Sequence, residues 1–479
     1  MSDAGQRLYE SAPVRVVRGA LGDAVASVWV VGGAVRDAIL GRPIMDVDLV
    51  TTDDPGAIAR AVASQTGGPA FPLSEKFGAW RVIADAGFVC DVSPLQGESI
   101  EDDLGRRDFS ANAMAMALAG PELLDPHGGR ADLEAGVLRV LSEQSYRDDV
   151  LRPLRLVRIA TELSLVPDAE TERLTRAHAG RVPETSPERI WAELRRLVIA
   201  ERVLDGLELA DRLGLTAAVL PELDRLRGVE QSHFHHLDVH GHTLEVLREQ
   251  LRLEAGLEDV FGPLTPELRA VLDEPLADEL TRMHALRFAA LMHDMAKPDT
   301  RRELPDGRVS FIGHDTVGEG LVVRVCRRFR TSERLASFLG DVTRHHLVLG
   351  FLVHERPLDR RAVYRYLRRC EPVEIEVTVL SCADRRATRG RNAEGAIAAH
   401  LDLAYDVMES ALAWRRDGAP KPPVRGDELA HELGIARGPE LGRLLEAIRE
   451  GVFAGDVQDR DQAVGYARAL LDDYLRGSS

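Results

Sequence analysis

The chain has 479 residues and a hydrophobic fraction of 44%, which is ordinary for a soluble globular protein. This length is too great for a single core, and usual domain sizes predict about three or four units. The net charge of -17 argues against a protein that coats nucleic acid with its whole surface, because phosphate contacts need Lys and Arg.

Membrane, secreted and zinc-ribbon proteins are also disfavoured. No apolar run approaches the ~18 residues of a membrane span, and residues 1–10 lack the apolar core of a signal peptide. The four cysteines are scattered without a Cys-x-x-Cys pair, which argues against a zinc ribbon and a disulfide framework. We therefore expect a cytoplasmic protein without a membrane partner.

The stretch 28–51 carries the clearest signal, after a leading segment that we expect to be helical. An apolar run, 28–31, is typical of a strand. Gly32 and Gly33 interrupt it, and a helical composition then continues up to Gly41. Because a second apolar run follows, the predicted order is strand, glycine turn, helix and strand.

The second apolar run contains Asp46 and Asp48. Residues two apart on a strand face the same side, so the carboxylates are expected to lie side by side. Like charges this close repel, and Mg²⁺ prefers such hard oxygen ligands. Gly32 and Gly33 let a phosphate approach closely, and Arg36 lies in the helical turn after them. Each piece alone is more often a solvated edge or a simple turn, but together they predict a site for a nucleoside triphosphate and its metal.

A family resemblance rests on two motifs, Gly32-Gly33-Ala34-Val35-Arg36-Asp37 and Asp46-Val47-Asp48. They resemble the head of the class II tRNA nucleotidyltransferase and bacterial poly(A) polymerase family. The resemblance implies template-independent transfer of nucleotides to an RNA 3′ end. It implies that Asp46 and Asp48 are catalytic and hold Mg²⁺, and that Gly33 and Arg36 bind the triphosphate.

Two β-rich runs, 79–84 and 88–92, surround a turn and predict a hairpin. Asp91 in the second run would lie beside the Asp pair, and the resemblance implies that it is a third catalytic carboxylate. Many family members continue with a long mobile loop that is linked to addition of the terminal A. Here the chain reaches the next motif soon after Gly97, so the final nucleotide stays open.

The next motif runs from Arg106 to Ala113. Asp108 and Asn112 are four apart, and on a helix they would share a face. The pattern by itself is more typical of a helix start with a surface ion pair. The resemblance implies that Arg107 contacts triphosphate, while Asp108 and Asn112 hydrogen-bond sugar hydroxyls.

Three arginines, Arg152, Arg155 and Arg158, recur at every third residue of a predicted helix. A solvated basic face is the ordinary explanation of such a pattern. The resemblance implies that Asp149 and Arg152 select the incoming base and that Arg155 and Arg158 belong to the nucleotide site. Because Arg donates and Asp only accepts, the pair can match the edges of cytosine and adenine.

Arginines gather between Arg139 and Arg196, which predicts RNA binding there and not over the acidic remainder. Ser186 and Pro187 have the residue types of a helix cap and a first helical position. This segment also resembles a neck motif of the family. We therefore expect a helical neck after the head.

A second constellation contains His242, His293-Asp294 and Asp384, in this order. It resembles the metal-dependent HD phosphohydrolase domain, and the resemblance implies that these four residues hold a metal. Imidazole and carboxylate ligands together suit Mn²⁺, Ni²⁺ or Co²⁺, with a bound water as the nucleophile. A structural His at a helix end is the ordinary alternative, and HD domains of this family are either active or structural.

Two further segments complete the helical part. Residues 254–279 are acidic, with Arg269 as their only base, and are predicted to form a solvated insertion. His314, His345 and His346 are candidates for a second ion, although 15 histidines make accidental candidates common. The tail, with a stiff linker at 420–423 and an apolar helical run at 463–471, fits either a small helical cap or the RNA-gripping C-terminal region of the family.

The predicted fold class is α+β, a nucleotidyltransferase head with a mixed sheet followed by a mostly helical body with an HD domain. The expected boundaries are 1–150 for the head, 151–228 for a neck that binds base and RNA, 229–400 for the HD domain and 401–479 for the C-terminal RNA-binding region.

The resemblance implies a tRNA nucleotidyltransferase that adds CCA, or part of it, to tRNA 3′ ends from CTP and ATP, with no DNA partner. The alternatives are a poly(A) polymerase, a CC-only or A-only enzyme, and an HD phosphohydrolase as the main activity. A non-catalytic RNA-binding protein would not need the Asp pair.

Overall fold

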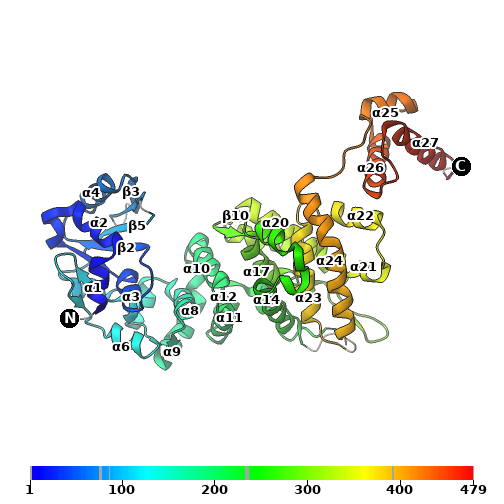
Figure 1. Ribbon diagram of the computed structural model, residues 1–479. Coiled ribbons are helices and arrows are strands. Elements are labelled where there is room, and N and C mark those ends of the chain that lie inside the picture. The colour runs from blue at the N-terminus through cyan, green and yellow to red at the C-terminus, as the bar shows by residue number, and fades with distance from the viewer. Residues whose placement is uncertain (1–2, 75–77, 86, 232–236, 391–392, 478–479) are drawn as a thin grey trace. The chain divides into compact units, whose positions relative to one another are not determined.

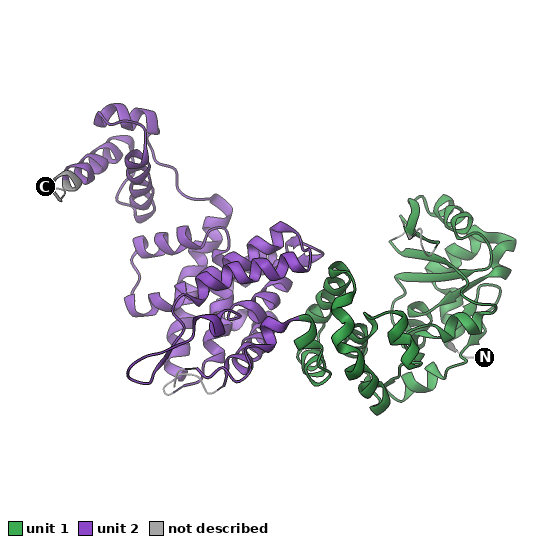
Figure 2. Ribbon diagram, turned by 180° about the vertical axis from the view of Figure 1, so that it is seen from behind, with its two compact units in different colours: residues 1–219 green, residues 220–479 purple. Residues whose placement is uncertain are grey.

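The computed structural model describes residues 3–74, 78–85, 87–231, 237–390 and 393–477. The chain forms two compact units, residues 1–219 and 220–479, which Figure 2 shows in green and purple. Unit 1 contains a seven-stranded sheet, whereas unit 2 consists mainly of helices. This division confirms the predicted α+β class with its helical body.

Unit 1 is built around a mixed sheet with the strand order β3-β4-β5-β2-β1-β6-β7 (Figure 1). β2 pairs in parallel with β5 and antiparallel with β1, and β4 and β5 form the predicted hairpin. The strands are β1 (Val28–Val31), β2 (Asp46–Thr51), β3 (Ala70–Ser74), β4 (Ala79–Ile83), β5 (Val89–Pro94), β6 (Ala115–Ala117) and β7 (Leu123–Leu124).

β2 lies inside the sheet with one face buried. Val47 and Leu49 are buried on that face, while Asp46 is exposed and Asp48 half-buried on the other. The parallel register places Asp48 opposite Asp91 of β5. The alternation along β2 therefore presents the carboxylates on the face away from Val47 and Leu49.

The glycine turn between β1 and β2 has the predicted form. α3 (Gly33–Ile39) begins directly after Gly32, which has a φ of +70°. L-residues with side chains rarely adopt this conformation, and a Cβ there would lie only 3.0 Å from the Arg107 guanidinium. The strand, turn, helix and strand order is confirmed.

The leading segment forms two helices, α1 (Asp3–Glu10) and α2 (Ala12–Leu21), where one was predicted. Pro13 lies in the first turn of α2, where its missing N–H is tolerated, so a new helix begins after Ser11. α1 packs on α3, and α2 packs on α4 (Pro55–Thr66), which itself packs on β4 and β5.

Helices complete unit 1 after the sheet. α8 (Arg152–Leu163) begins at the predicted basic motif, with Pro153 in its first turn. α10 (Pro187–Ile199) and α11 (Val203–Arg212) both pack against α8. Ser186 precedes α10 as predicted, but its side chain makes no capping hydrogen bond.

Unit 2 packs three helices against one another, α14 (Val239–Ala255), α17 (Arg282–Met292) and α23 (Glu374–Ala387) (Figure 1). α20 (Glu333–His345) packs on α17, and α19 (His314–Arg328) packs on α20. The helices predicted around 242–253 and 286–292 are confirmed.

The prediction of a solvated insertion at residues 254–279 is wrong. The segment forms α15 (Glu258–Phe261), α16 (Thr265–Leu272) and a short strand pair, and α15 packs on α24 (Ala393–Asp417). Apolar residues at helical spacing are buried between exposed acidic ones. The fully buried side chains are those of Leu257, Phe261, Leu268 and Leu272.

The C-terminal helices share a small core of their own. They are α25 (Gly426–Leu433), α26 (Pro439–Ala454) and α27 (Arg460–Gly477), with Leu429, Ile448 and Ala463 buried between them. α22 (Arg360–Cys370) packs on α26 within the same unit. The helical run predicted at 463–471 is confirmed.

The four cysteines are buried and free, which agrees with the absence of a disulfide framework. Among the described residues, no helix combines the length and the apolar character that a membrane crossing needs.

Candidate functional site

A cavity of about 450 Å³ opens in unit 1 over the carboxylate face of β2. Gly32 of the predicted glycine turn lines it, and so do Asp37, Pro43, Met45 and Arg196, which the sequence did not single out as site residues. The sequence-predicted residues on its wall are Gly33, Arg36, Asp46, Asp48, Arg107, Asp108, Asn112, Asp149, Arg152, Arg155 and Arg158.

The floor of this cavity holds a cluster of carboxylates. Asp91 is not among the residues that line the cavity, and Arg81 of β4 donates to both of its oxygens at 2.8 and 2.7 Å. Burial raises the pKa of Asp48, Arg107 opposes that shift, and the neighbouring Asp91 and Asp46 raise the pKa further. These oxygen donors fit a divalent cation, which would relieve the repulsion.

Arg36 and Arg107 reach the cavity beside the glycine turn. Arg36 donates to Asn112 Oδ1 at 2.7 Å and pairs with Asp37 at 2.9 Å. Arg107 pairs with Asp103 at 3.1 Å. Both guanidinium groups are therefore held in place by protein side chains.

Asp108 and Asn112 do not lie on one α-helix, so that prediction is wrong. Phe109 is fully buried and forms a β-bridge with Val140, which keeps the chain extended, and only a 3₁₀ turn (Ser110–Asn112) follows. The two side chains still meet, because Asn112 Nδ2 donates to Asp108 Oδ1 at 3.0 Å. Burial would raise the pKa of Asp108, but Arg155, whose guanidinium lies 2.9 Å away, together with Asn112 and Arg152 lowers it.

Asp149 and Arg152 lie on the same wall but have different partners. Arg189 of α10 pairs with the Asp149 carboxylate at 2.6 Å. The Arg152 guanidinium donates to the backbone oxygens of Arg106, Arg107 and Ser145 at 2.9 to 3.1 Å. A nucleotide base that contacted Asp149 or Arg152 would have to replace these hydrogen-bond partners.

Arg158 has a different environment from the other cavity arginines. Its side chain is only 6% exposed and is bound by Glu162 of its own helix and Glu193 of α10. Arg196 of α10 binds Glu162 from the solvent side. These pairs fasten α10 to α8.

The basic segment 139–196 is less open to RNA than its composition suggests. Many of its arginines are neutralised locally, as in the pairs Arg139–Asp132, Arg147–Glu143, Arg173–Glu170, Arg176–Glu172 and Arg181–Glu184. RNA binding at this segment stays a prediction.

In unit 2, three helices bring the second predicted constellation together. His242 Nε2 lies 3.0 Å from Asp384 Oδ1 and 3.8 Å from Asp294 Oδ2. His293 Nε2 lies 3.2 Å from Asp294 Oδ2, and Lys297 Nζ pairs with the same oxygen at 2.7 Å. Ligand atoms of His242, His293 and Asp384 lie within 4.8 Å of one another, and imidazole with carboxylate fits a transition metal.

Charges within this cluster shift each other's protonation. Burial would raise the pKa of Asp294, but His293 and Lys297 hold it well below its usual range. Burial would also raise the pKa of Asp384, but His242 holds it below its usual range. Burial would lower the pKa of His293, but Asp294 and Asp384 together raise it. Both carboxylates are thus kept in the ionised form that a metal requires.

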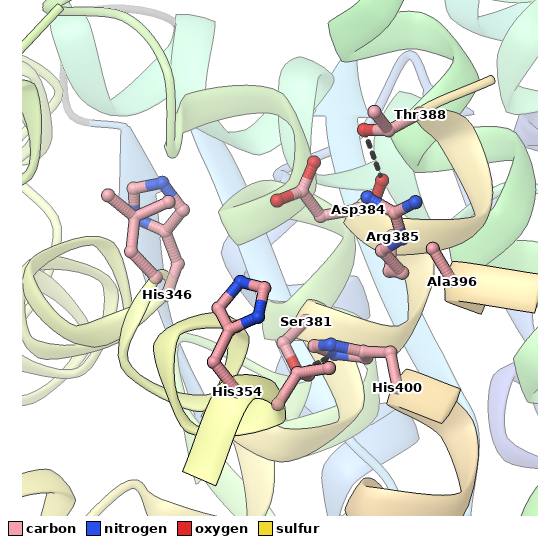
Figure 3. Close-up of a pocket in the computed structure, with 11 residues that line it drawn as sticks. His346, His354, Ser381, Asp384, Arg385, Thr388, Ala396 and His400 are labelled. Atoms are coloured by element: carbon pink, nitrogen blue, oxygen red, sulfur yellow. Dashed lines mark hydrogen bonds between the residues drawn. The ribbon is translucent and has the colours of Figure 1, made fainter. Parts of the chain in front are cut away.

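A second cavity, of about 230 Å³, lies beside this cluster (Figure 3). Asp384 and His346 are on its wall together with His354, Arg385 and His400. His400 Nε2 lies 3.1 Å from Ser381 Oγ, and burial lowers the pKa of His400 to about 4. His354 and His400 were missed from the sequence because no local pattern distinguishes them from the other histidines.

Comparison with known families agrees with this arrangement. Family models match the chain as a Poly A polymerase head domain at residues 28–139, as a "Probable RNA and SrmB- binding site of polymerase A" at 166–226 and as an HD domain at 267–389. The chain thus has a nucleotidyltransferase head joined to an HD domain.

Whole-chain comparisons define the family. The chain is 35% identical to an A-adding tRNA nucleotidyltransferase of Deinococcus radiodurans, over 92% of this chain and 95% of the relative. It is 33% identical to a CC-adding tRNA nucleotidyltransferase of Thermus thermophilus, over 93% of each. It is 31% identical to a multifunctional CCA protein of Acidovorax sp., over 88% and 94%. The chain belongs to the tRNA nucleotidyltransferase family.

Solved structures share the fold. A CCA-adding enzyme in complex with CTP aligns with a TM-score of 0.64 at 21% identity, over 98% of this chain and 99% of the other. The Thermotoga maritima CCA-adding enzyme complexed with tRNA aligns with a TM-score of 0.61 at 22% identity, over the same shares.

Arg158→Ala should lower the free energy of unfolding by about 3 kcal/mol, because it leaves two mostly buried carboxylates without their shared cation. Arg196→Ala, at a half-exposed guanidinium that binds the same Glu162, should cost less than about 1 kcal/mol. Urea unfolding of both variants measures the difference. Equal losses would show that Arg158 does not fasten α10 to α8.

Proposed function

We propose that this chain is a tRNA nucleotidyltransferase that transfers CMP or AMP from CTP or ATP to the 3′ hydroxyl of tRNA and releases pyrophosphate. One observation carries the proposal: the cavity of unit 1 joins a carboxylate pair, a glycine turn and several arginines. The family supports it, because relatives over almost the whole chain are named for adding A, CC or CCA to tRNA.

Asp46 and Asp48 are the residues that would hold Mg²⁺. When bound, the metal supplies a lowered pKa for the attacking hydroxyl and positive charge for the leaving pyrophosphate. In the pairing of β2 with β5, Asp91 lies opposite Asp48, and Arg81 holds Asp91 in place through an ion pair. The charge of Asp91 repels those of Asp46 and Asp48 and so helps to position the two carboxylates. Gly33, Arg36 and Arg107 orient the triphosphate, and Asp108 with Asn112 binds the sugar.

Asp149 and Arg152 select the base in this proposal. Both groups line the cavity, one as an acceptor and the other as a fork of donors. Arg155 follows Arg152 on α8 and adds positive charge near the phosphates. Protein side chains would therefore act as the template.

The relatives are named for different products of the reaction. Identities of 35, 33 and 31% to A-adding, CC-adding and multifunctional CCA relatives are too close to choose among them. Extension of tRNA that lacks its 3′ end, with CTP, ATP or both, separates CC, A, CCA and poly(A) products by length.

Asp46→Ala should abolish this extension and leave the fold intact, because the carboxylate is exposed on the cavity face of β2. Asp53→Ala, two residues beyond the same strand, is the matched control and should extend tRNA normally. Incorporation is measured with radiolabelled CTP and ATP. If Asp46→Ala still extended tRNA, Asp46 would not be a ligand of a metal that the reaction needs.

The raised pKa of Asp48 predicts a dependence on pH and metal together. Protons and Mg²⁺ compete for the same carboxylates, so extension at limiting Mg²⁺ should fall as the pH drops through this raised pKa. More Mg²⁺ should move the fall to lower pH. A pH profile that is the same at low and high Mg²⁺ would contradict a shared site.

A second candidate activity, hydrolysis of phosphate esters by unit 2, is favoured by the cluster of His242, His293, Asp294 and Asp384. A 2′,3′-cyclic nucleotide should be hydrolysed with Mn²⁺, Ni²⁺ or Co²⁺ present, and His293→Ala should lose this activity while it retains tRNA extension. Hydrolysis that survives in His293→Ala would assign the activity elsewhere.

A further inference from the structure

Apolar side chains are exposed on one face of the sheet in unit 1. α4 packs on the opposite face of β4 and β5, where Val82 and Cys90 are fully buried. Phe71 of β3 is 38% exposed, and both Ile83 of β4 and Leu73, two residues after Phe71, are 46% exposed. Apolar side chains that gather on an exposed surface, unlike scattered single ones, indicate an interaction site. Phe71, Leu73 and Ile83 are called the apolar platform below.

The strand pairing joins the apolar platform to the carboxylate floor of the cavity. Phe71 lies opposite Arg81 of β4, and Arg81 lies opposite Asp91 of β5. Asp91 lies opposite Asp48 of β2. Paired residues point to the same face of a sheet, and neighbouring strands are ~4.8 Å apart. Phe71 and Asp48 are therefore about 14 Å apart across the same face, three strand spacings from each other.

Arg81 lies between the apolar platform and the carboxylate pair. Its side chain is 38% exposed and binds Asp91 at 2.7 Å. The hydrogen bond to Asp91 raises the pKa of Arg81, and the charges of Asp46 and Asp48 raise it further. Arg81 is thus within the electrostatic reach of the carboxylate pair, and its exposed part offers a cationic donor to a phosphate that lies beside the pair.

The proposed reaction leaves this side of the carboxylate pair for the RNA. The residues that would orient the triphosphate lie on the β1 side, because Gly33 begins the helix after β1 and Arg107 lies beside Gly32. In phosphoryl transfer the attacking and leaving oxygens are roughly in line. The attacking 3′ hydroxyl therefore approaches from the opposite side, where the strand order places β5, β4 and β3.

The edge of the sheet favours RNA over a protein strand as the occupant. β3 is the edge strand, and it contains Pro72, which has no backbone N–H to donate. Proline in an edge strand opposes the addition of a further strand from another chain. Bases of single-stranded RNA need no such donor, because they stack on aromatic side chains and are held largely without regard to sequence.

We infer that the apolar platform binds the unpaired nucleotides at the 3′ end of the RNA, with a base stacked on Phe71, and this contact rests on the proposed function. Phe71 is about 14 Å from Asp48, so the base on Phe71 belongs to a nucleotide before the one that carries the attacking hydroxyl. Ile83 and Leu73 extend the apolar surface under the neighbouring base, and Arg81 faces the phosphate between the platform and the carboxylate pair.

Steady-state extension of tRNA by the full chain tests the platform. Phe71→Ala should lower kcat/KM for tRNA by roughly 5- to 100-fold, the effect of losing one base–aromatic stack, and should leave the KM for CTP or ATP unchanged. Phe71→Trp keeps an aromatic ring and should restore the use of tRNA. Phe351→Ala is the matched control, because it removes an aromatic side chain that is 67% exposed in unit 2, and it should extend tRNA normally.

A photocrosslink locates the contact directly. 5-Iodocytidine is placed one nucleotide before the 3′ end of the tRNA, and after irradiation the crosslinked peptide should contain Phe71. An unchanged kcat/KM for tRNA in Phe71→Ala, with normal extension by the unaltered chain, would overturn the platform alone. A smaller mass of Phe71→Ala in light scattering, with that same unchanged kcat/KM, would assign the face to a second copy of the chain. An unaltered chain that extends no tRNA would contradict the proposed function as well.

Discussion

The parallel pairing of β2 with β5 is the constraint on which unit 1 depends. It sets Asp48 opposite Asp91, and Asp46 lies two residues earlier on the same face. Carboxylates this close repel each other unless cations lie among them; Arg81 pairs with Asp91, and Arg107 does not fully offset the raised pKa of Asp48. In the proposed function these two remaining carboxylates hold a divalent ion, and the triphosphate binds above them beside the sharp turn at Gly32.

The polar groups around this floor hold each other before a substrate enters. Arg155 is paired with Asp108, Arg189 with Asp149, and Arg36 with Asn112. In the proposed function, side chains fixed in this way lose little conformational freedom when a nucleotide binds, which favours discrimination between bases. Arg158 contributes to this fixed geometry indirectly. Its buried ion pairs hold α10, which carries Arg189, against α8.

Local patterns in the sequence predicted β1 and β2 from their apolar runs and α8 from arginines that recur at every third residue. The prediction failed where distant contacts decide the conformation. A bridge to Val140 prevents a helix at Asp108, and docking on α24 buries Phe261 within a segment that looked solvated. The sequence offered His314, His345 and His346 together as candidates for a second ion, and only the fold distinguishes His314 and His346, which lie beside Asp294, from the third.

The account depends on a cation held by Asp46 and Asp48 under a bound nucleotide. Crystals grown with MnCl₂ and a non-hydrolysable CTP analogue, measured at the manganese absorption edge, locate that ion directly. The account predicts anomalous density between the two carboxylates, with the triphosphate over Gly32 and Gly33. A nucleotide bound in this cavity without manganese at the pair, or bound in another part of the chain, would contradict it.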